Sequence, residues 1–188
     1  MTLDLSLLPD GGSAWLDGSG EQPGIVLSSR VRLARNVAGY AFPPRARDGE
    51  RLRLLSQIKE AAPTVPMLAD GVLLRVDELA ETERQLLHER HLVSKELAGL
   101  EAPHPLRSGA ALWVADTVSV MINEEDHLRL QALRSGFAVE SAFSAVDKLG
   151  RQIGAAVPYS FHEEFGFLTA CPTNVGTGLR ASVLIHLP

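Results

Sequence analysis

The sequence predicts an α+β fold in which a mainly antiparallel sheet is flanked by helices. Two observations lead to this fold class. Several short stretches alternate apolar and polar residues with the two-residue period of a strand, and some are separated by so few residues that they can pair locally. Other stretches place apolar residues at helical intervals, and these lie between sets of strands. This order is typical of α+β proteins.

Residues 1–24 are predicted to form a short N-terminal segment, because they are rich in glycine and Trp15 is their obvious apolar anchor. Residues 25–188 are predicted to form one domain. Its first elements are a strand from Ile25, a helix over residues 48–62 that proline ends, a short strand over 72–76, and a helix that Asp77 caps and that runs to about His91.

The second half of the chain is predicted to contain further strands and one helix. Two strands, 111–114 and 117–122, are expected to form a hairpin, and the next strand covers 127–133. Apolar residues at helical spacing predict a helix from Ala138 to beyond Ile153. The last elements are a strand over residues 165–170 and a strand over 179–187.

Composition excludes several classes of protein. The 188 residues are 45% hydrophobic and carry a formal net charge of −5, which argues against nucleic acid as the main ligand because that ligand requires a dominant basic surface. No apolar run approaches the roughly 20 residues that span a bilayer. The single cysteine cannot form an internal disulfide and the N-terminus lacks the basic start of a signal peptide, so a cytoplasmic location is predicted.

Cys171 opens the stretch that carries the most candidate chemistry, C-P-T-N-V-G-T-G-L-R-A-S-V, which ends at Val183. Proline and glycine shape a turn in front of the following strand, and this turn is expected to present Cys171 and Thr173 at a strand edge. The alternative for an isolated cysteine is a buried structural thiol.

Two further stretches carry charge in a pattern that suggests a site. N-E-E-D-H-L-R, from Asn123 to Arg129, places three acids directly after a strand; an acidic turn is the alternative. S-S-R-V-R, from Ser28, alternates Arg30 and Arg32 with apolar residues, so both arginines project from one face of a strand. A guanidinium fork matches phosphate oxygens, so we predict a phosphate clamp, with solvated surface as the alternative. Neither common glycine-rich phosphate loop occurs in the sequence.

These three motifs, in this order and at compatible spacings, resemble those of the guanidino-phosphotransferase family, which comprises the phosphagen kinases and the bacterial McsB-type protein arginine kinases. The resemblance extends from Ile25 to Pro188. It implies the family's catalytic-domain fold, an antiparallel sheet flanked by helices. It also implies ATP as the phosphoryl donor, with Mg²⁺ bound through the nucleotide and not by protein ligands.

The resemblance also implies a role for individual residues. Glu125 would hold the acceptor guanidinium and take its proton, while Glu124 and Asp126 support the loop or metal-bound water. Cys171 would act as a thiolate that orients and polarises the acceptor without a covalent bond. The residues implied in nucleotide binding are Ser28, Ser29, Arg30, Val31, Arg32, His91, Arg129, Arg180, Ala181, Ser182, Val183 and Leu184.

Two departures from the metabolite kinases favour the protein arginine kinase branch. Only 27 residues precede Ser28, where the metabolite kinases carry a helical domain, and Leu184 stands where those enzymes usually have histidine. We therefore predict phosphorylation of arginine side chains in proteins. A phosphagen kinase acting on free arginine or another small guanidine, and a catalytically inactive binding or regulatory protein, stay open as alternatives.

The resemblance implies protein substrates with exposed arginines as partners, together with a stress-response repressor, an activating adaptor protein and a ClpC-type protease system; homo-oligomer formation stays open. In the family the pattern continues beyond Pro188 with a glycine-rich segment that bears another ATP-binding arginine and a second catalytic glutamate. The expectation is therefore an incomplete catalytic domain that by itself has little or no kinase activity.

Overall fold

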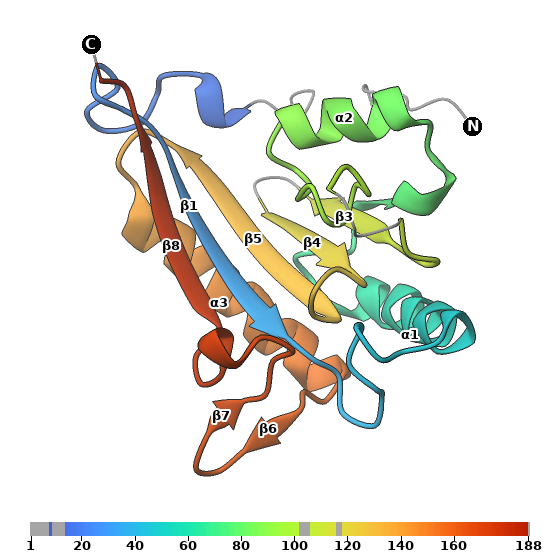
Figure 1. Ribbon diagram of the computed structural model, residues 1–188. Coiled ribbons are helices and arrows are strands. Elements are labelled where there is room, and N and C mark those ends of the chain that lie inside the picture. The colour runs from blue at the N-terminus through green and yellow to red at the C-terminus, as the bar shows by residue number, and fades with distance from the viewer. Residues whose placement is uncertain (1–7, 9–13, 102–105, 116–117, 188) are drawn as a thin grey trace.

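A computed structural model describes residue 8 and residues 14–101, 106–115 and 118–187 (Figure 1). The helices are α1 (Asp48–Ala61), α2 (Glu81–Glu89) and α3 (Val139–Ala156). The strands are β1 (Val26–Arg35), β2 (Val72–Arg75), β3 (Ala111–Ala115), β4 (Val118–Ile122), β5 (Leu128–Ser135), β6 (Phe161–His162), β7 (Gly166–Phe167) and β8 (Leu179–Ile185).

Six of these strands form one sheet in the order β2-β3-β4-β5-β1-β8, and each pair of neighbours is antiparallel. The strands β6 and β7 form a separate small hairpin near one end of β8 (Figure 1). The predicted α+β fold with a mainly antiparallel sheet is therefore confirmed. The central strands β3 and β4 are buried along their whole length, which explains their almost continuous apolar sequence.

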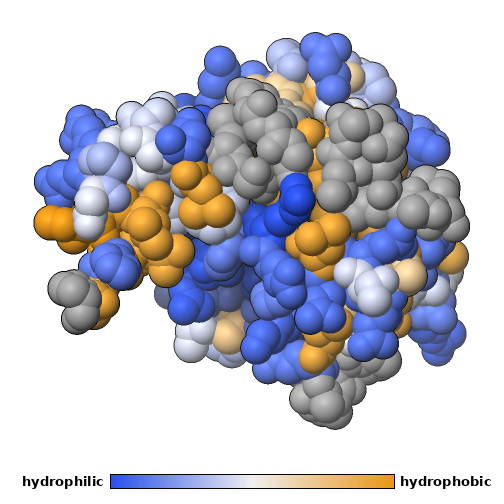
Figure 2. Space-filling view, turned by 90° about the horizontal axis from the view of Figure 1, so that it is seen from above, coloured by the Kyte–Doolittle hydropathy of each residue, from blue (hydrophilic) through white to orange (hydrophobic). Residues whose placement is uncertain are grey.

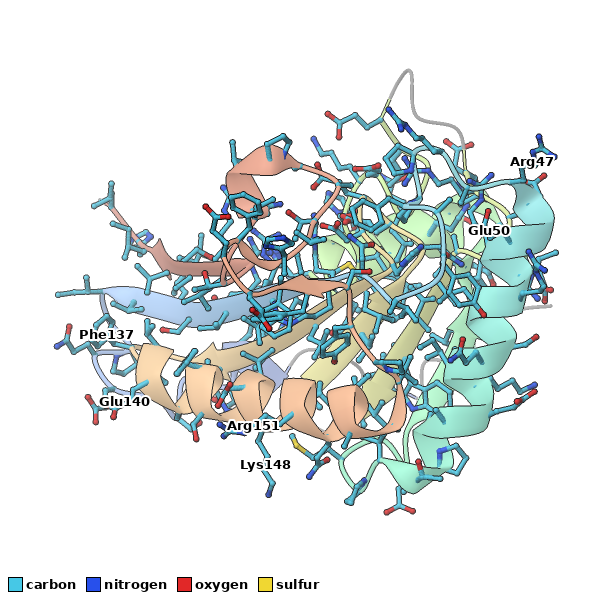
Figure 3. All side chains as sticks on the ribbon, turned by 90° about the horizontal axis from the view of Figure 1, so that it is seen from below. Arg47, Glu50, Phe137, Glu140, Lys148 and Arg151 are labelled. Carbon is cyan, nitrogen blue, oxygen red and sulfur yellow. The ribbon has the colours of Figure 1, made fainter. Side chains whose placement is uncertain are left out.

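The helices α1 and α3 cover one face of the sheet (Figures 1 and 3). Leu149 and Ile153 of α3 pack with Leu54 and Ile58 of α1 in the larger hydrophobic core, which also contains the apolar side of β1, β4 and β5. The outer side of α3 carries charged residues that point away from the sheet, among them Glu140 and Arg151 (Figure 3). This division into an apolar and a charged side is the pattern that predicted the helix.

A second core lies on the opposite face, where α2 and the loops around it cover only the β2, β3 and β4 part of the sheet. Leu87 of α2 packs there with Leu74, Leu112 and Met121. The part of this face formed by β5, β1 and β8 carries polar side chains instead. We call this part the arginine face, because Arg30, Arg32, Arg129 and Arg180 lie on it, as shown below.

The predicted elements agree with the structure where the periodicity was long. The predicted helices over 48–62 and from 138 correspond to α1 and α3, and Trp15 is buried, with its indole N–H donating to the carbonyl of Arg90 at 3.3 Å. The start of the hairpin strand predicted at Thr117 lies outside the described residues.

Two predictions were wrong. Residues 165–170 do not form a strand beyond Gly166–Phe167, because the partner strand β6 is only two residues long and no other strand among the described residues pairs with them. Asp77 does not cap α2, which begins at Glu81. Its carboxylate instead accepts from the backbone N–H of Gly109 at 2.7 Å and from the guanidinium of Arg75 at 2.8 Å.

The strand β8 forms one edge of the sheet, and most of its residues are exposed. Its outer end contributes to a hydrophobic patch that Figure 2 shows on the side of the molecule where the C-terminus lies. The exposed apolar residues there include Ile25, Leu27, Val183, Leu184, Ile185 and Leu187. The only irregularity in the β1–β8 register falls between Val26 and Ser28, at this same end. No helix in the described part of the chain is long and apolar enough to cross a membrane.

Candidate active site

The strand register gathers four arginines from three strands. Arg32 of β1 lies directly opposite Arg180 of β8. On the other side of β1, Ala34 pairs with Arg129 of β5. Because side chains two residues apart share a face, Arg30 and Arg32 both project on the side where Arg129 and Arg180 lie. Strand pairing thus brings together the arginines of the predicted phosphate clamp, which are up to 150 positions apart in the sequence.

The four guanidinium groups repel one another. Burial, together with the charges of the neighbouring Arg30, Arg129 and Arg180, lowers the pKa of Arg32 to about 10. Burial and two of the same neighbours also lower the pKa of Arg30, whose Nε has no hydrogen-bond partner among the described residues. Like charges at this density destabilise one another until an anion joins them. The arginine face therefore fits a ligand with several negative charges, such as a polyphosphate.

Two neighbouring cavities open on the arginine face, the first of about 70 Å³ and the second of about 150 Å³. The first cavity contains the predicted acceptor-binding acid Glu125 and three of the four predicted phosphate-binding arginines. Its lining residues are Arg32, Ala34, Glu125, Arg129, Asn174, Gly178 and Arg180. The second is lined by Ser28, Arg30, His91, Leu133, Ser182, Val183 and Leu184. Most of the predicted site residues therefore fall into two groups that share the strands β1 and β8.

The three acids lie in the tight turn between β4 and β5. Asn123 adopts a left-handed conformation with φ of 60°, which asparagine tolerates better than most residues, and its N–H donates to the carbonyl of His127 at 3.0 Å. Glu124 is 1% exposed and accepts a hydrogen bond from Arg129. Glu125 is one third exposed at its side chain and lies 3.3 Å from the same guanidinium. Of the three, Glu125 is thus the acid that faces the cavity.

The local charges make Glu125 easier to protonate than an ordinary glutamate. Burial raises its pKa above the ordinary value of 4.5, the carboxylates of Asp126 and Glu124 add to this rise, and Arg129 opposes it. Asp126 is fully buried, which raises its pKa as well. Buried in this way, Asp126 lies away from the cavity and cannot hold metal-bound water there.

We expect the side-chain carboxyl of Glu125 to titrate above pH 4.5 when followed by carbon NMR, because the raised pKa means that the folded protein keeps this proton to higher pH. Any reaction that needs ionised Glu125 should lose rate as pH falls through the same midpoint. The variant Arg129→Gln removes the opposing cation and should move the midpoint higher. A midpoint at or below 4.5 in the wild-type protein would contradict this view of the turn.

Cys171 lies next to the 3₁₀ turn Pro172–Asn174 that precedes β8. Its thiol is partly buried, and Sγ lies 3.0 Å from the hydroxyl of Thr173. The chain returns to the sheet at Gly178, where a side chain would collide with the carbonyl of Ala34 at 2.6 Å, so only glycine fits. The alternative of a buried structural thiol does not describe Cys171.

Four predicted nucleotide-binding residues do not direct their side chains onto the arginine face. Val31 is fully buried in the core beneath α3, and the Ser29 hydroxyl bonds to the carbonyl of Gly136 and the N–H of Ala138, at 2.8 and 2.9 Å. Ala181 pairs with Val31 and Val183 pairs with Ser29, so both share the side of the sheet that faces α3. At these positions only the backbone is available to a ligand on the arginine face.

Sequence reasoning missed Asn36, which follows β1 and is completely buried beside Asp126. It also missed Arg35, whose guanidinium lies 3.6 Å from the centre of the Phe167 ring and donates to the carbonyl of Thr177 at 2.8 Å. A buried asparagine has no periodic signal that could have revealed it. The described residues contain no cluster of three or more His, Cys, Asp or Glu that could hold a metal ion.

Comparison with known proteins agrees with this geometry. Residues 54–188 match the family described as ATP:guanido phosphotransferase, C-terminal catalytic domain. The chain is 44% identical to a protein-arginine kinase of Moorella thermoacetica and 40% identical to one of Bacillus cereus, over 98% and 100% of this chain. In both cases the match covers 52% of the relative, so the chain spans about half the length of these curated relatives.

Solved structures of related kinases have the same fold. A taurocyamine kinase of Schistosoma mansoni matches with a TM-score of 0.78 and 28% identity, over 99% of this chain and 26% of that one. A lombricine kinase matches with a TM-score of 0.71 and 25% identity, over 100% of this chain and 53% of that one. The family match covers well over half of the chain, and the fold and the clustered arginines agree with it. The chain therefore belongs to the ATP:guanido phosphotransferase family.

Proposed function

We propose that the protein transfers the terminal phosphoryl group of ATP to arginine side chains of other proteins. The observation that carries this proposal is the cavity in which Glu125 faces three arginines, Arg32, Arg129 and Arg180. A carboxylate suits the cationic acceptor and the arginines suit the anionic donor. The likeness to protein-arginine kinases at 40–44% identity supports the choice of a protein acceptor.

The reaction would use these residues in different ways. A guanidinium nitrogen of the acceptor attacks the γ-phosphorus, the bond from that phosphorus to the β,γ-bridging oxygen breaks, and ADP leaves with the electron pair. The nitrogen loses a proton, which the ionised carboxylate of Glu125 accepts. Arg32 and Arg180 neutralise charge on the phosphoryl oxygens, which is the main requirement of phosphoryl transfer. Cys171 would orient the acceptor guanidinium from the other side.

The second cavity would hold the nucleoside, between His91 and the Ser182 side of β8. Burial and the charge of Arg30 lower the pKa of His91, so that a neutral imidazole would face the nucleotide at neutral pH. Mg²⁺ would bind through the phosphates and supply further neutralisation of their charge. We also propose a cytoplasmic location, and as partners a stress-response repressor, an adaptor protein and a ClpC-type protease, as the resemblance implies.

The acceptor can be tested by direct competition. With Mg-ATP and a protein that carries the complete catalytic domain, we expect acid-labile phosphoarginine on a chemically unfolded, arginine-containing test protein. Its rate should be at least tenfold above that on free arginine at equal guanidinium concentration, a difference of about 1.4 kcal/mol in transition-state stabilisation. The matched control is the same test protein with its arginines blocked by a dicarbonyl reagent, which should give no product.

Two other outcomes would point to the alternatives. The structural relatives are named as kinases of the small guanidines taurocyamine and lombricine. Equal or faster phosphorylation of free arginine or of these compounds would therefore favour a phosphagen kinase. Binding of ATP without transfer to either class of acceptor would favour a binding or regulatory protein.

A further inference from the structure

A buried side chain joins the two halves of the candidate active site. The Oδ1 atom of Asp126 accepts a hydrogen bond from the backbone N–H of Ala170 at 2.6 Å. Asp126 is the residue after Glu125, and Ala170 is the residue before Cys171. Because consecutive Cα atoms lie only about 3.8 Å apart, this bond ties the backbone positions of Glu125 and Cys171 to each other by a very short path.

Asn36 strengthens the same connection. Its Nδ2 donates to Oδ1 of Asp126 at 2.6 Å and to the carbonyl of Leu168 at 3.2 Å, while its Oδ1 accepts from the N–H of His127 at 2.8 Å. Asn36 and Asp126 are both fully buried. The acidic turn and the segment before Cys171 are thus held together by a small polar network at the end of β1.

Several other hydrogen bonds of the Cys171 segment close it on itself, although the N–H of Leu168 donates to the carbonyl of Ser160 at 2.9 Å and Arg35 donates to that of Thr177 at 2.8 Å. Phe167 and Gly176 exchange two backbone hydrogen bonds, of 2.9 and 3.1 Å, and the hydroxyl of Thr169 donates to the carbonyl of Cys171 at 2.7 Å. These contacts fix the shape of the loop from Leu168 to Val175. They do not fix its distance from the acidic turn, which the bonds from Asp126 and Asn36 can do.

We infer that Asp126 is a positioning residue, whose bond to Ala170 sets the placement of Cys171 relative to Glu125. The inference rests on the proposed function, because it assumes that both residues act on one acceptor guanidinium. Asp126 itself does not reach the cavity. Its second oxygen, Oδ2, is buried without a hydrogen-bond partner among the described residues, so the carboxylate works through Oδ1 alone.

The chemistry of Asp126 supports a specific role. Burying an ionised carboxylate with one unpaired oxygen is unfavourable, and an apolar residue would avoid that cost if only packing mattered. A charged acceptor, however, makes the strongest hydrogen bonds to the two N–H groups that converge on Oδ1. A displacement of about 1 Å in a reacting group can lower the rate about 10²-fold. A strong and short connection between the positions of Glu125 and Cys171 would therefore help to maintain the rate of the reaction.

The test combines hydrogen exchange with kinetics. In Asp126→Ala the Ala170 amide, followed by NMR, should exchange about tenfold faster or more, and kcat for arginine phosphorylation should fall about 10–10²-fold. The KM for ATP should stay within about twofold. Asp126→Asn keeps an acceptor oxygen, so its Ala170 exchange rate and its kcat should both lie between those of the wild type and of Asp126→Ala. If the alanine variant does not fold, the asparagine variant provides the test.

Asn123→Gly is the matched control. Asn123 is 1% exposed and belongs to the same turn, but its side chain bonds to the carbonyls of Arg51 and Gly109, away from the Cys171 segment. Glycine tolerates its φ of 60°. This variant should lose stability to thermal unfolding while the Ala170 amide stays protected.

Several outcomes would overturn the inference. A fall in kcat with Ala170 still protected would mean that Asp126 acts in another way, and fast exchange at Ala170 with unchanged kcat would mean that the link does not position the site. If a protein that carries the complete catalytic domain shows no kinase activity, the proposed function fails separately. The link between Asp126 and Ala170 can still be tested by the exchange rate of the Ala170 amide and by the alkylation rate of Cys171, the only cysteine in the sequence. If the link exists, both rates rise in Asp126→Ala. If the link does not exist, neither rate rises.

Discussion

Replacing Glu125 by glutamine should reduce phosphoarginine formation by about 10²–10⁴-fold, the usual effect of losing a general base. The amide is nearly isosteric with the carboxylate, so the turn and the 3.3 Å approach to Arg129 need change little. It cannot accept the proton that the attacking nitrogen releases, and it no longer attracts the cationic acceptor. The loss should therefore appear in kcat, while ATP binding measured by calorimetry stays close to the wild-type value.

Glu140→Gln provides the control for this experiment. Glu140 is an exposed glutamate on the outer side of α3, on the opposite face of the sheet from the cavity (Figure 3). The same change of charge and shape there should leave turnover unaltered. Turnover of Glu125→Gln within a few-fold of wild type would remove Glu125 from the mechanism and return the acidic turn to a structural role.

The second large effect is expected at Arg180, which lies opposite Arg32 and lines the same cavity. Arg180→Ala should weaken ATP binding about 10–10²-fold, because a charge-assisted hydrogen bond to phosphate contributes about 1.5–3 kcal/mol. Binding of adenosine, which has no phosphate, should change little. The melting temperature should stay the same or rise slightly, since the substitution removes one of four mutually repelling cations.

Arg151→Ala is the comparison for Arg180→Ala. Arg151 is 75% exposed at its side chain and pairs with Asp147 on the outer side of α3. It has the same charge but no phosphate to bind, so its loss should leave ATP affinity unchanged. Equal ATP affinity in the wild type and Arg180→Ala would show that the arginine face does not bind the triphosphate.

Local sequence patterns were sufficient for the elements that carry long periodic signals. The helix α3 has an apolar side of buried residues from Ala142 to Ile153, and β1 alternates arginine with apolar residues, so both could be predicted without knowledge of their partners. Residues 165–170 are a short, largely apolar run, but a strand also needs a neighbour to bond with, and only two residues find one. Strand formation there depends on tertiary structure that the local pattern does not contain.

Some residues of the candidate site could be predicted from local sequence motifs, and others could not. Motifs that stand together in the sequence identified Glu125, Cys171 and the arginines. The residues that hold them in place, Asn36 and Asp126, are ordinary polar residues at the ends of strands, and their importance depends on a contact between positions 90 residues apart. Sequence reasoning also placed Ser29 and Val31 beside the nucleotide. Their side chains face the other way, because neighbouring residues of a motif point to opposite faces once the motif forms a strand.

The register irregularity between Val26 and Ser28 has an implication for how this sheet can change during evolution. A strand shifted by one residue turns every side chain to the opposite face, so one added residue between Leu179 and Ser182 would direct Arg180 toward α3 and bring an apolar side chain into the cavity. A residue added beyond Leu184 could be absorbed by the existing bulge without moving Arg180. The edge strand can thus vary in length at its outer end, whereas its inner end must keep its residue count for the four arginines of the arginine face to meet.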